Sequence, residues 1–187
     1  MKLYVYDHCP YCVKARMIFG FKQIPFELIT LADDDIKTPT SMIGVKMTPI
    51  LEKDSGGFMP ESLDIISYVD QMKSPEMISS WKEDKKLSSW LDGLGGLHYQ
   101  LAVPRWSQSP LEDFKTESAK KYFKNRMEPK IGLFSDLLKE SSDLKKEMEE
   151  ELLQLEQLLK SDNFYFQKKL SVDDFHLFAV LRSLTIV

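Results

Sequence analysis

The sequence predicts an α/β domain at the N-terminus followed by an all-α domain. Three observations support this division. A strand, a helix and a second strand fit within the first thirty residues, the spacing of a βαβ unit. A hairpin pattern and a helical pattern then follow, up to residue 72. From Trp81 onward no strand pattern persists, and apolar residues recur at helical spacing instead.

The first domain is predicted to cover residues 1–72 in the order β-α-β-α-β-β-α. It opens with a strand over residues 1–6, which is rich in β-branched and aromatic side chains. A helix over residues 10–21 and a strand over residues 25–29 come next. Because a helix connects them, the two strands should be parallel.

The rest of this domain is predicted from turn and cap signals. Thr38 and Pro39 fit the N-cap and first position of a short helix that ends at Gly44. The run Asp-Ser-Gly-Gly at 54–57 indicates a tight turn between a third and a fourth strand, which should be antiparallel. A helix that opens at Pro60-Glu61-Ser62 then closes the domain.

Residues 73–80 are predicted as a linker and residues 81–187 as the helical domain. Its predicted helices cover residues 81–101, 114–138 and 141–160 and the stretch after Ser171, with a loop over 103–110. Gly93, Gly95 and Gly96 should kink the first of these helices or let another helix approach it closely, and Pro129 should break or kink the second.

The start of the last helix carries a specific signal. Ser171 as N-cap places Asp174 at the third helical position, a capping box with Asp in place of Glu. Leu170 and Phe175 have the spacing of a hydrophobic staple across the same turn. The residues that follow are apolar nearly all round, so we expect this helix to be buried.

Composition excludes several classes of protein. The net charge is −4, which gives no general electrostatic case for nucleic acid or an anionic membrane. No apolar run approaches the roughly 20 residues of a membrane span. Asp7 and His8 interrupt the apolar N-terminal stretch early, so we expect no signal peptide and a cytoplasmic location.

The two cysteines, Cys9 and Cys12, are the main chemical signal. They form a C-x-x-C pair between a predicted strand and helix, which indicates a thioredoxin-like redox site. Free N–H groups at a helix start stabilise a thiolate, the species that attacks disulfides. Pro10 suits the first helical position. We expect Cys9 to be the nucleophile and Cys12, one turn into the helix, to be the buried resolving thiol.

These features resemble the glutaredoxin 2 family, the two-domain, glutathione-transferase-like glutaredoxins of bacteria. Cys9-Pro10-Tyr11-Cys12 is similar to a glutaredoxin site, and Thr48-Pro49 to the cis-proline element of thioredoxin folds. Glu61-Ser62 resembles the pair that holds the γ-glutamyl end of glutathione in transferases. The resemblance is close from Met1 to Ser62 and looser to Val187. Chains of the family usually continue further, so part of the helical packing is expected to be missing.

The resemblance implies a glutathione-dependent thiol–disulfide oxidoreductase that acts as a monomer on disulfide-bearing or glutathionylated proteins. Glutathione is the co-substrate and no metal is expected. Besides Pro10, the residues implied in glutathione binding are Tyr11, Thr48, Pro49, Glu61 and Ser62. A valine is common at the position of Thr48, and only its backbone is expected to matter. For His8 there are two interpretations, a residue that tunes Cys9 and a solvent-facing neighbour of that thiol, and we expect the second.

Other interpretations remain open at this point. Cys9 and Cys12 could be metal ligands, although structural zinc needs four ligands and the three histidines lie far apart in the sequence. The chain could be a glutathione transferase that joins glutathione to electrophiles, although a transferase does not need the second thiol. It could also be a non-enzymatic, transferase-like scaffold. Glu61 and Ser62 could also have a purely structural role as a helix cap.

Overall fold

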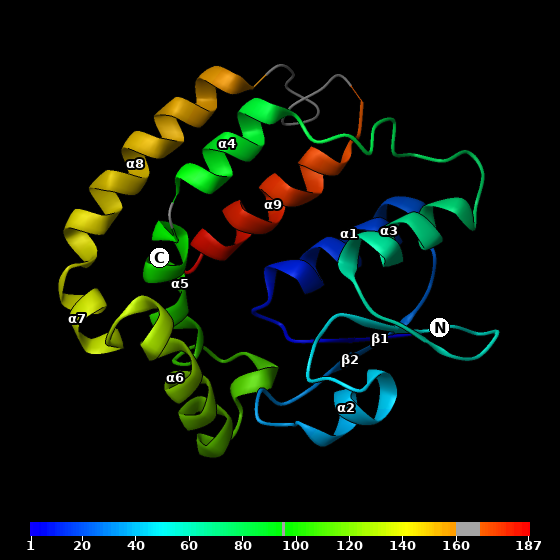
Figure 1. The fold of residues 1–187 in the computed structure, drawn as a ribbon, viewed down its shortest axis with the longest axis horizontal. Helices are drawn as coiled ribbons and strands as arrows, with labels where there is room; N and C mark the ends of the chain where they lie inside the picture. The colour runs from blue at the N-terminus through cyan, green and yellow to red at the C-terminus, as the bar shows by residue number, and fades with distance from the viewer. Residues whose placement is uncertain (95, 160–168) are drawn as a thin grey trace. The chain divides into compact units, whose positions relative to one another are not determined.

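The fold was obtained as a computed structural model, which describes residues 1–94, 96–159 and 169–187 (Figure 1). The chain divides into two compact units. The first unit contains Met1–Met77 and Ser109–Phe123, and the second contains Ile78–Gln108 and Lys124–Val187. Each unit has its own secondary structure and core, and each is described separately below.

A four-stranded sheet forms the centre of the first unit. Its strands are β1 (Lys2–Val5), β2 (Glu27–Thr30), β3 (Ile50–Glu52) and β4 (Phe58–Met59), in the order β2-β1-β3-β4. The pair β2-β1 is parallel and the pair β3-β4 is antiparallel, as the sequence predicts, and β1 pairs antiparallel with β3, for which the sequence made no prediction. Leu3 of β1, which is fully buried, aligns with Leu28 on one side and Leu51 on the other.

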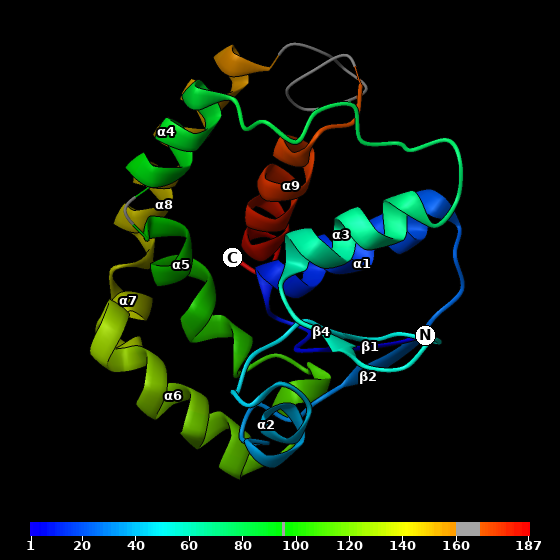
Figure 2. The same cartoon turned by 45° about the vertical axis from the view of Figure 1, so that its right-hand side comes forward.

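Two helices, α1 (Pro10–Lys22) and α3 (Ser62–Gln71), lie side by side against the sheet (Figure 2). They bury their apolar faces because those side chains recur at helical spacing. The fully buried positions are Ala15 and Ile18 of α1 and Ile65, Ile66 and Val69 of α3. This packing fixes the N-terminal ends of both helices relative to the sheet, and both ends carry candidate site residues.

The short helix α2 (Lys37–Ile43) ends at Gly44, as predicted, but starts one residue before the predicted N-cap. Asp35 rather than Thr38 supplies the side-chain cap, because its Oδ1 accepts the N–H of Thr38 at 2.9 Å. Gly44 has φ +81°, a conformation that glycine adopts without the steric cost of a Cβ. The prediction was therefore right at the glycine and wrong at the cap.

The segment Ser109–Phe123 packs with the first unit, although the sequence placed it in the helical half. It contains a 3₁₀ turn, η1 (Glu112–Phe114), and the first part of α6 (Glu117–Ile131). Phe114 and Phe123 are both about 1% exposed and their rings meet edge to face at 4.8 Å. Compact units are not the same as folding domains, so the domain boundaries at 72 and 81 remain a prediction.

The second unit is built from helices packed on a leucine-rich core. Its helices, besides the rest of α6, are α4 (Lys85–Gly93), α5 (Leu97–Trp106), α7 (Phe134–Lys139), α8 (Ser141–Leu158) and α9 (Val172–Leu184). The core draws on α4, α5, α8 and α9, through residues such as Leu87, Leu101, Leu155 and Leu177. In the described part of the chain no helix is both long and apolar enough to cross a membrane.

The helix boundaries differ from the predictions at two places. The predicted helix 81–101 is two helices, separated around Gly96, which has φ +91°. The predicted loop over 103–110 is wrong for residues 103–106, because α5 continues through Pro104 to Trp106, and right for residues 107–110. Val103 and Trp106 are buried, and their burial outweighs the poor helix propensity of proline. Gly95 and Lys160, the predicted end of α8, lie outside the described residues.

Pro129 does not break α6 either, since the helix runs two residues further and the chain turns at Gly132 instead.

The prediction for the last helix is confirmed. Ser171 caps α9, and its N–H donates to Asp174 Oδ2 at 2.8 Å in a capping box. Leu170 and Phe175, the predicted staple residues, are both buried. An α/β domain followed by helices, the predicted fold class, is confirmed.

Candidate active site

Cys9 and Cys12 stand at the start of α1, where strand β1 delivers the chain. Cys9 is the N-cap residue in an extended conformation, and its carbonyl accepts the N–H of Val13 at 3.0 Å. Pro10 takes the first helical position, where its missing N–H has no partner to lose. Both cysteines are free thiols; Cys9 is half-buried and Cys12 is fully buried. The predicted burial of Cys12 is therefore confirmed.

The environment makes the two thiols unequal. A hydrogen bond from Cys12 is the largest cause that lowers the pKa of Cys9, from its ordinary value of 9.0 to about 6. The charge of His8 and the backbone N–H groups of Cys12 and Tyr11 lower it further, while burial opposes them. About nine-tenths of Cys9 is then thiolate at pH 7, against about one-hundredth for an ordinary thiol.

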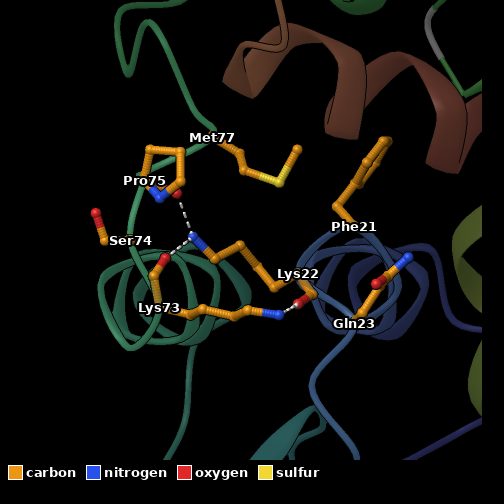
Figure 3. A pocket seen from close by; sticks show the side chains of 7 residues that line it. All are labelled: Phe21, Lys22, Gln23, Lys73, Ser74, Pro75 and Met77. Carbon is orange, nitrogen blue, oxygen red and sulfur yellow. Dashed lines mark hydrogen bonds between the residues drawn. The ribbon is translucent and has the colours of Figure 1, made fainter.

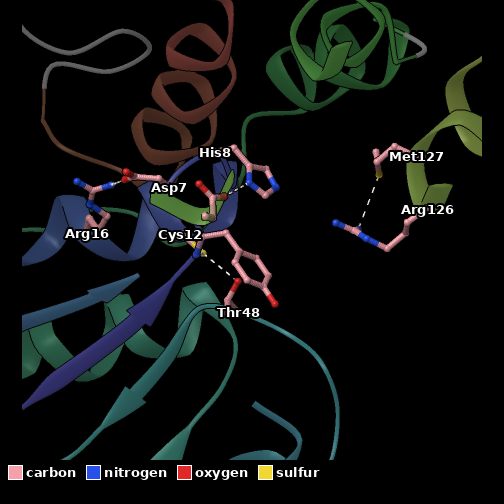
Figure 4. A network of polar contacts seen from close by, with 9 residues as sticks. Asp7, His8, Cys12, Arg16, Thr48, Arg126 and Met127 are labelled. Atoms are coloured by element: carbon pink, nitrogen blue, oxygen red, sulfur yellow. Dashed lines mark hydrogen bonds and ion pairs between the residues drawn. The ribbon is translucent and has the colours of Figure 1, made fainter. Parts of the chain in front are cut away.

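Burial raises the pKa of Cys12 well above its ordinary value, and the hydrogen bond to Cys9 raises it further. Two groups act in the opposite direction. The backbone N–H of Tyr6 donates to Cys12 Sγ at 3.4 Å, and Thr48 Oγ1 lies 3.2 Å from the same sulfur (Figure 4). The Thr48 hydroxyl accepts from the thiol and can donate to the thiolate. Cys12 is thus a protonated donor while Cys9 is free.

Thr48 and Pro49 are joined by a cis peptide bond and both are buried, in the loop that leads into β3. The cis bond is as the resemblance implies. The hydroxyl contact with Cys12 was not expected, because the resemblance implied a role only for the Thr48 backbone. Thr48 lies 36 residues after Cys12, and nothing in the local sequence around it indicates such a contact.

Glu61 and Ser62 stand at the N-terminus of α3. Glu61 is the N-cap with φ +68° and makes no side-chain cap hydrogen bond, while Ser62 is the buried first helical residue. A positive φ is unusual for a residue with a Cβ, and such residues cluster at ligand-binding sites. These two residues belong to the same candidate site as the cysteines because α3 packs beside α1.

Tyr11 lies between the two cysteines and points outward. Its side chain is 54% exposed, and the ammonium of Lys14 lies 4.5 Å from the ring centroid. A large exposed aromatic side chain beside a reactive thiol can form one wall of a substrate groove. The site thus combines one acidic, half-buried thiol, one buried thiol and an exposed ring within a single turn of helix.

His8 contradicts the prediction that it faces solvent. It is 7% exposed, and its Nδ1 makes an ion pair with Oδ2 of Asp113, which is completely buried. The partner lies 105 residues away in the sequence and comes from η1. No local pattern could have found it, since the pair exists only because Ser109–Phe123 packs with the first unit.

A separate cavity of about 330 Å³ lies at the other end of α1 (Figure 3). Inside it the ammonium of Lys22 donates to the carbonyls of Lys73 and Pro75 and pairs with Asp70 at 3.1 Å. The helix of 13 residues is about 20 Å long, so this cavity is remote from Cys9.

Among the described residues no group of three His, Cys, Asp or Glu side chains could hold a metal ion.

Comparison with known proteins identifies relatives for both halves of the chain. Residues 86–187 match the family model described as glutaredoxin 2, C terminal domain, and residues 3–76 match the glutathione S-transferase N-terminal domain. Glutaredoxin 2 of Escherichia coli K12 is 45% identical over all 187 residues, which align with 86% of its length.

Solved structures agree with this result. The crystal structure of glutaredoxin 2 from Salmonella typhimurium in complex with glutathione superposes with a TM-score of 0.94 at 44% identity. The match covers the whole of this chain and 84% of that one. Glutathione transferase GSTFuA3 from Phanerochaete chrysosporium matches with a TM-score of 0.73 at 13% identity, over 99% of this chain and 84% of that one, which shows a shared fold. The resemblance stated from the sequence is confirmed.

Proposed function

Because this chain belongs to the glutaredoxin 2 family and is a glutathione-dependent thiol–disulfide oxidoreductase, we propose that Cys9 attacks its substrates and Cys12 resolves the product. The single observation that carries the assignment is the asymmetry of the two thiols. Cys9 is accessible and acidic, whereas Cys12 is buried and holds its proton. Thiolate is the attacking species, so only Cys9 is ready to react.

In the monothiol route, the Cys9 thiolate attacks the glutathione sulfur of a glutathionylated protein. A bond forms between these two sulfurs while the original disulfide breaks, and the protein leaves as a thiolate that takes a proton. A second glutathione, as thiolate, then attacks the mixed disulfide on Cys9. Glutathione disulfide leaves, and the Cys9 thiolate is restored without any net change in the enzyme.

In the dithiol route, Cys9 attacks a protein disulfide and becomes joined to one of its sulfurs. Cys12 then loses its proton and attacks Cys9 Sγ, which releases the substrate as a dithiol and leaves a Cys9–Cys12 disulfide. Two glutathione molecules reduce that disulfide in turn: the first attacks Cys9 Sγ and frees Cys12, and the second attacks the mixed disulfide and leaves with the first as glutathione disulfide. We expect the couple to lie at about −200 to −230 mV, the range of glutaredoxins.

We propose that glutathione lies along the exposed ring of Tyr11, next to Pro10, with its cysteine paired with the backbone of Thr48 before Pro49. Two observations support this placement. Tyr11 is the most exposed residue around the thiols, and Thr48 is already within 3.2 Å of Cys12 Sγ. A peptide that passes between them would bring its sulfur to Cys9.

The γ-glutamyl end of glutathione is proposed to bind at Glu61 and Ser62. Its α-carboxylate suits the free N–H groups at the start of α3, a helix of ten residues. Its ammonium can pair with the carboxylate of Glu61, which the N-cap geometry leaves without a cap hydrogen bond. The positive φ of Glu61 is the local observation that favours a binding role over a cap alone.

Protein partners and location are further proposals. The substrates are disulfide-bearing or glutathionylated proteins, and the chain acts as a monomer. Free Cys9 and Cys12 suit the reducing cytoplasm, where thiols persist. Sedimentation of the reduced protein would test the monomer, and a dimer at micromolar concentration would contradict it.

The decisive experiment compares two serine variants with glutathionylated and disulfide-bearing substrates. Cys9→Ser should abolish both routes, whereas Cys12→Ser should lose the dithiol route and keep the monothiol route. Glutathione should protect Cys9 from alkylation and be found between Tyr11, Thr48 and Ser62 in a complex. If Cys9→Ser still reduces a glutathione mixed disulfide, the assignment is wrong. Faster conjugation of an electrophile than disulfide reduction would instead favour a transferase.

A further inference from the structure

The residue before the nucleophile, His8, has a buried carboxylate as its partner. Asp113 Oδ2 pairs with His8 Nδ1, and the exposed fractions of the two residues are 0% and 7%. Within the described residues, the other carboxylate oxygen of Asp113 makes no hydrogen bond. A buried carboxylate is costly unless it is paired. His8 is therefore the side chain that compensates for the burial of this charge.

Aromatic rings hold His8 in a fixed orientation. Tyr6 stacks on the imidazole at 5.7 Å with an interplanar angle of 9°, and Phe114 stacks at 5.0 Å. Phe123 meets the same ring edge to face at 5.0 Å. Phe114 and Phe123 come from the same segment as Asp113. This one segment therefore supplies two of the rings that contact His8 and the carboxylate that pairs with it.

Asp113 is itself held in place by the backbone. Its carbonyl accepts the N–H of Asp33 at 3.0 Å, which ties η1 to the loop after β2. Its side chain contacts His8 Nδ1 through Oδ2. A carboxylate that accepts the Nδ1–H of a histidine fixes the orientation of the ring.

The connection to the reaction runs through Cys9. The N–H of Cys9 donates to the carbonyl of Tyr6 at 3.3 Å, so the chain turns tightly and places His8 beside the thiol. Among charged side chains, His8 supplies the Coulombic contribution that lowers the pKa of Cys9. Asp113 contacts the imidazole of His8, so the influence on the thiol that we infer passes through the ring.

We propose that Asp113 is a positioning residue for the nucleophile: by pairing with His8 it holds the charge of the imidazole beside the Cys9 sulfur. The inference rests on the proposed role of Cys9. The segment Ser109–Phe123, which lies in the helical half of the sequence, would then influence the reactivity of a thiol about 100 residues earlier in the chain.

Other charged groups near this site have their own partners. Asp7 pairs with Arg16 at 2.9 Å (Figure 4). The ammonium of Lys46 lies 4.8 Å from the ring centroid of Tyr6 and 4.9 Å from that of Tyr122. None of these contacts passes through Asp113, so a substitution of Asp113 leaves them in place and reports on the His8 contact.

The test is the pH at which Cys9 is half ionised, measured from its rate of alkylation in the reduced, full-length protein. Asp113→Asn keeps the shape but removes the charge, and it should raise the midpoint by about half to one pH unit. At pH 5 the alkylation rate should fall about threefold to tenfold. The matched control is Glu112→Gln, because Glu112 is exposed, lies one residue away and pairs only along its own turn with Lys115. It should leave the midpoint unchanged.

A double-mutant cycle shows whether Asp113 acts through the ring. His8→Gln alone should raise the midpoint by a similar amount, and Asp113→Asn should add nothing in that background. An unchanged midpoint in either folded single variant, or additive shifts in the double variant, would overturn the inference. Should Asp113→Asn fail to fold, Asp113→Glu, which keeps the charge, and Asp113→Ser take its place in the cycle, and an unchanged midpoint in His8→Gln would still overturn the inference.

These outcomes are separable from failure of the proposed function. If Cys9 is not the nucleophile, Cys9→Ser stays active, whatever the alkylation midpoints of the Asp113 and His8 variants. If Asp113 is merely structural, its substitution lowers the melting temperature without a change in the midpoint of Cys9. A shifted midpoint together with an inactive Cys9→Ser supports both the function and the positioning role.

Discussion

Removal of the Cys12 thiol should make Cys9 a weaker acid. The hydrogen bond from Cys12 is the largest cause that lowers the pKa of Cys9, ahead of the charge of His8 and the backbone N–H groups. In Cys12→Ala the donor is lost and the side-chain volume changes little. The other two stabilising influences remain, because Pro10 still starts α1 and His8 stays in its aromatic surroundings.

The magnitude follows from the value for the intact site. A decrease from 9.0 to about 6 corresponds to roughly 4 kcal/mol, at 1.36 kcal/mol per pH unit. A hydrogen bond to a charged group contributes about 1.5–3 kcal/mol, or about one to two pH units. We therefore expect Cys9 to be half ionised at about pH 7 to 8 in Cys12→Ala. At pH 6 its thiolate fraction should be about five- to fiftyfold lower.

The assay is the rate of alkylation by iodoacetamide between about pH 4 and pH 10. In Cys12→Ala only Cys9 can react, and in the wild type the modified cysteine can be identified by mass spectrometry of the peptide that contains the motif. Cys12→Ser is the matched control. Its hydroxyl can still donate to the Cys9 thiolate, so its midpoint should lie between those of the wild type and Cys12→Ala.

Two results would refute this reasoning. A wild-type midpoint near 9 would mean that the start of α1 does not stabilise the thiolate at all. A midpoint near 6 in both the wild type and Cys12→Ala would mean that the helix and His8 suffice, and that the second thiol contributes nothing to acidity. The second result would leave Cys12 with a role only in resolving mixed disulfides.

Three further predictions test other contacts. Thr48→Val removes the hydroxyl 3.2 Å from Cys12 Sγ, so stopped-flow measurements should show slower dithiol reduction, by about threefold to tenfold, at an unchanged monothiol rate. Lys22→Ala or Asp70→Ala breaks an ion pair whose side chains are about 1–2% exposed, so the free energy of unfolding in urea should fall by about 3–5 kcal/mol. The exposed pair of Lys146 and Asp143 in α8 is the control, and its loss should cost under about 1 kcal/mol. Ser171→Ala removes a buried N-cap and should cost about 1 kcal/mol by the same measurement, and a loss under about 0.3 kcal/mol would contradict the capping role.

Features with a local cause could be predicted from the sequence. The parallel pair β1 and β2 follows from strand, helix and strand within thirty residues. The capping box at Ser171 and the helix end at Gly44 follow from residues that satisfy free backbone groups or accept a positive φ. The position of Cys9 at the start of α1 belongs to the same class, because Pro10 suits the first helical position.

Features that depend on tertiary packing could not be predicted. Pro104 suggested a loop, yet the buried residues around it keep α5 helical to Trp106. His8 looks like a polar residue near a surface thiol, and its burial depends on the segment that brings Asp113 and two phenylalanines to it. A pairing across 105 residues leaves no periodic or spacing signal in a single sequence.

The hydrogen bond between the two cysteines also gives an order to the two steps of the dithiol route. It lowers the pKa of Cys9 and raises that of Cys12, because the proton it requires stays on the buried sulfur. Once Cys9 is joined to a substrate it carries no charge, so the contributions of Cys9 that raise the pKa of Cys12 disappear. Burial still raises it, but Thr48 and the N–H of Tyr6 now act on Cys12 without opposition from a neighbouring thiolate. Cys12 therefore becomes easier to ionise only after the mixed disulfide exists, which is when the second step needs its thiolate.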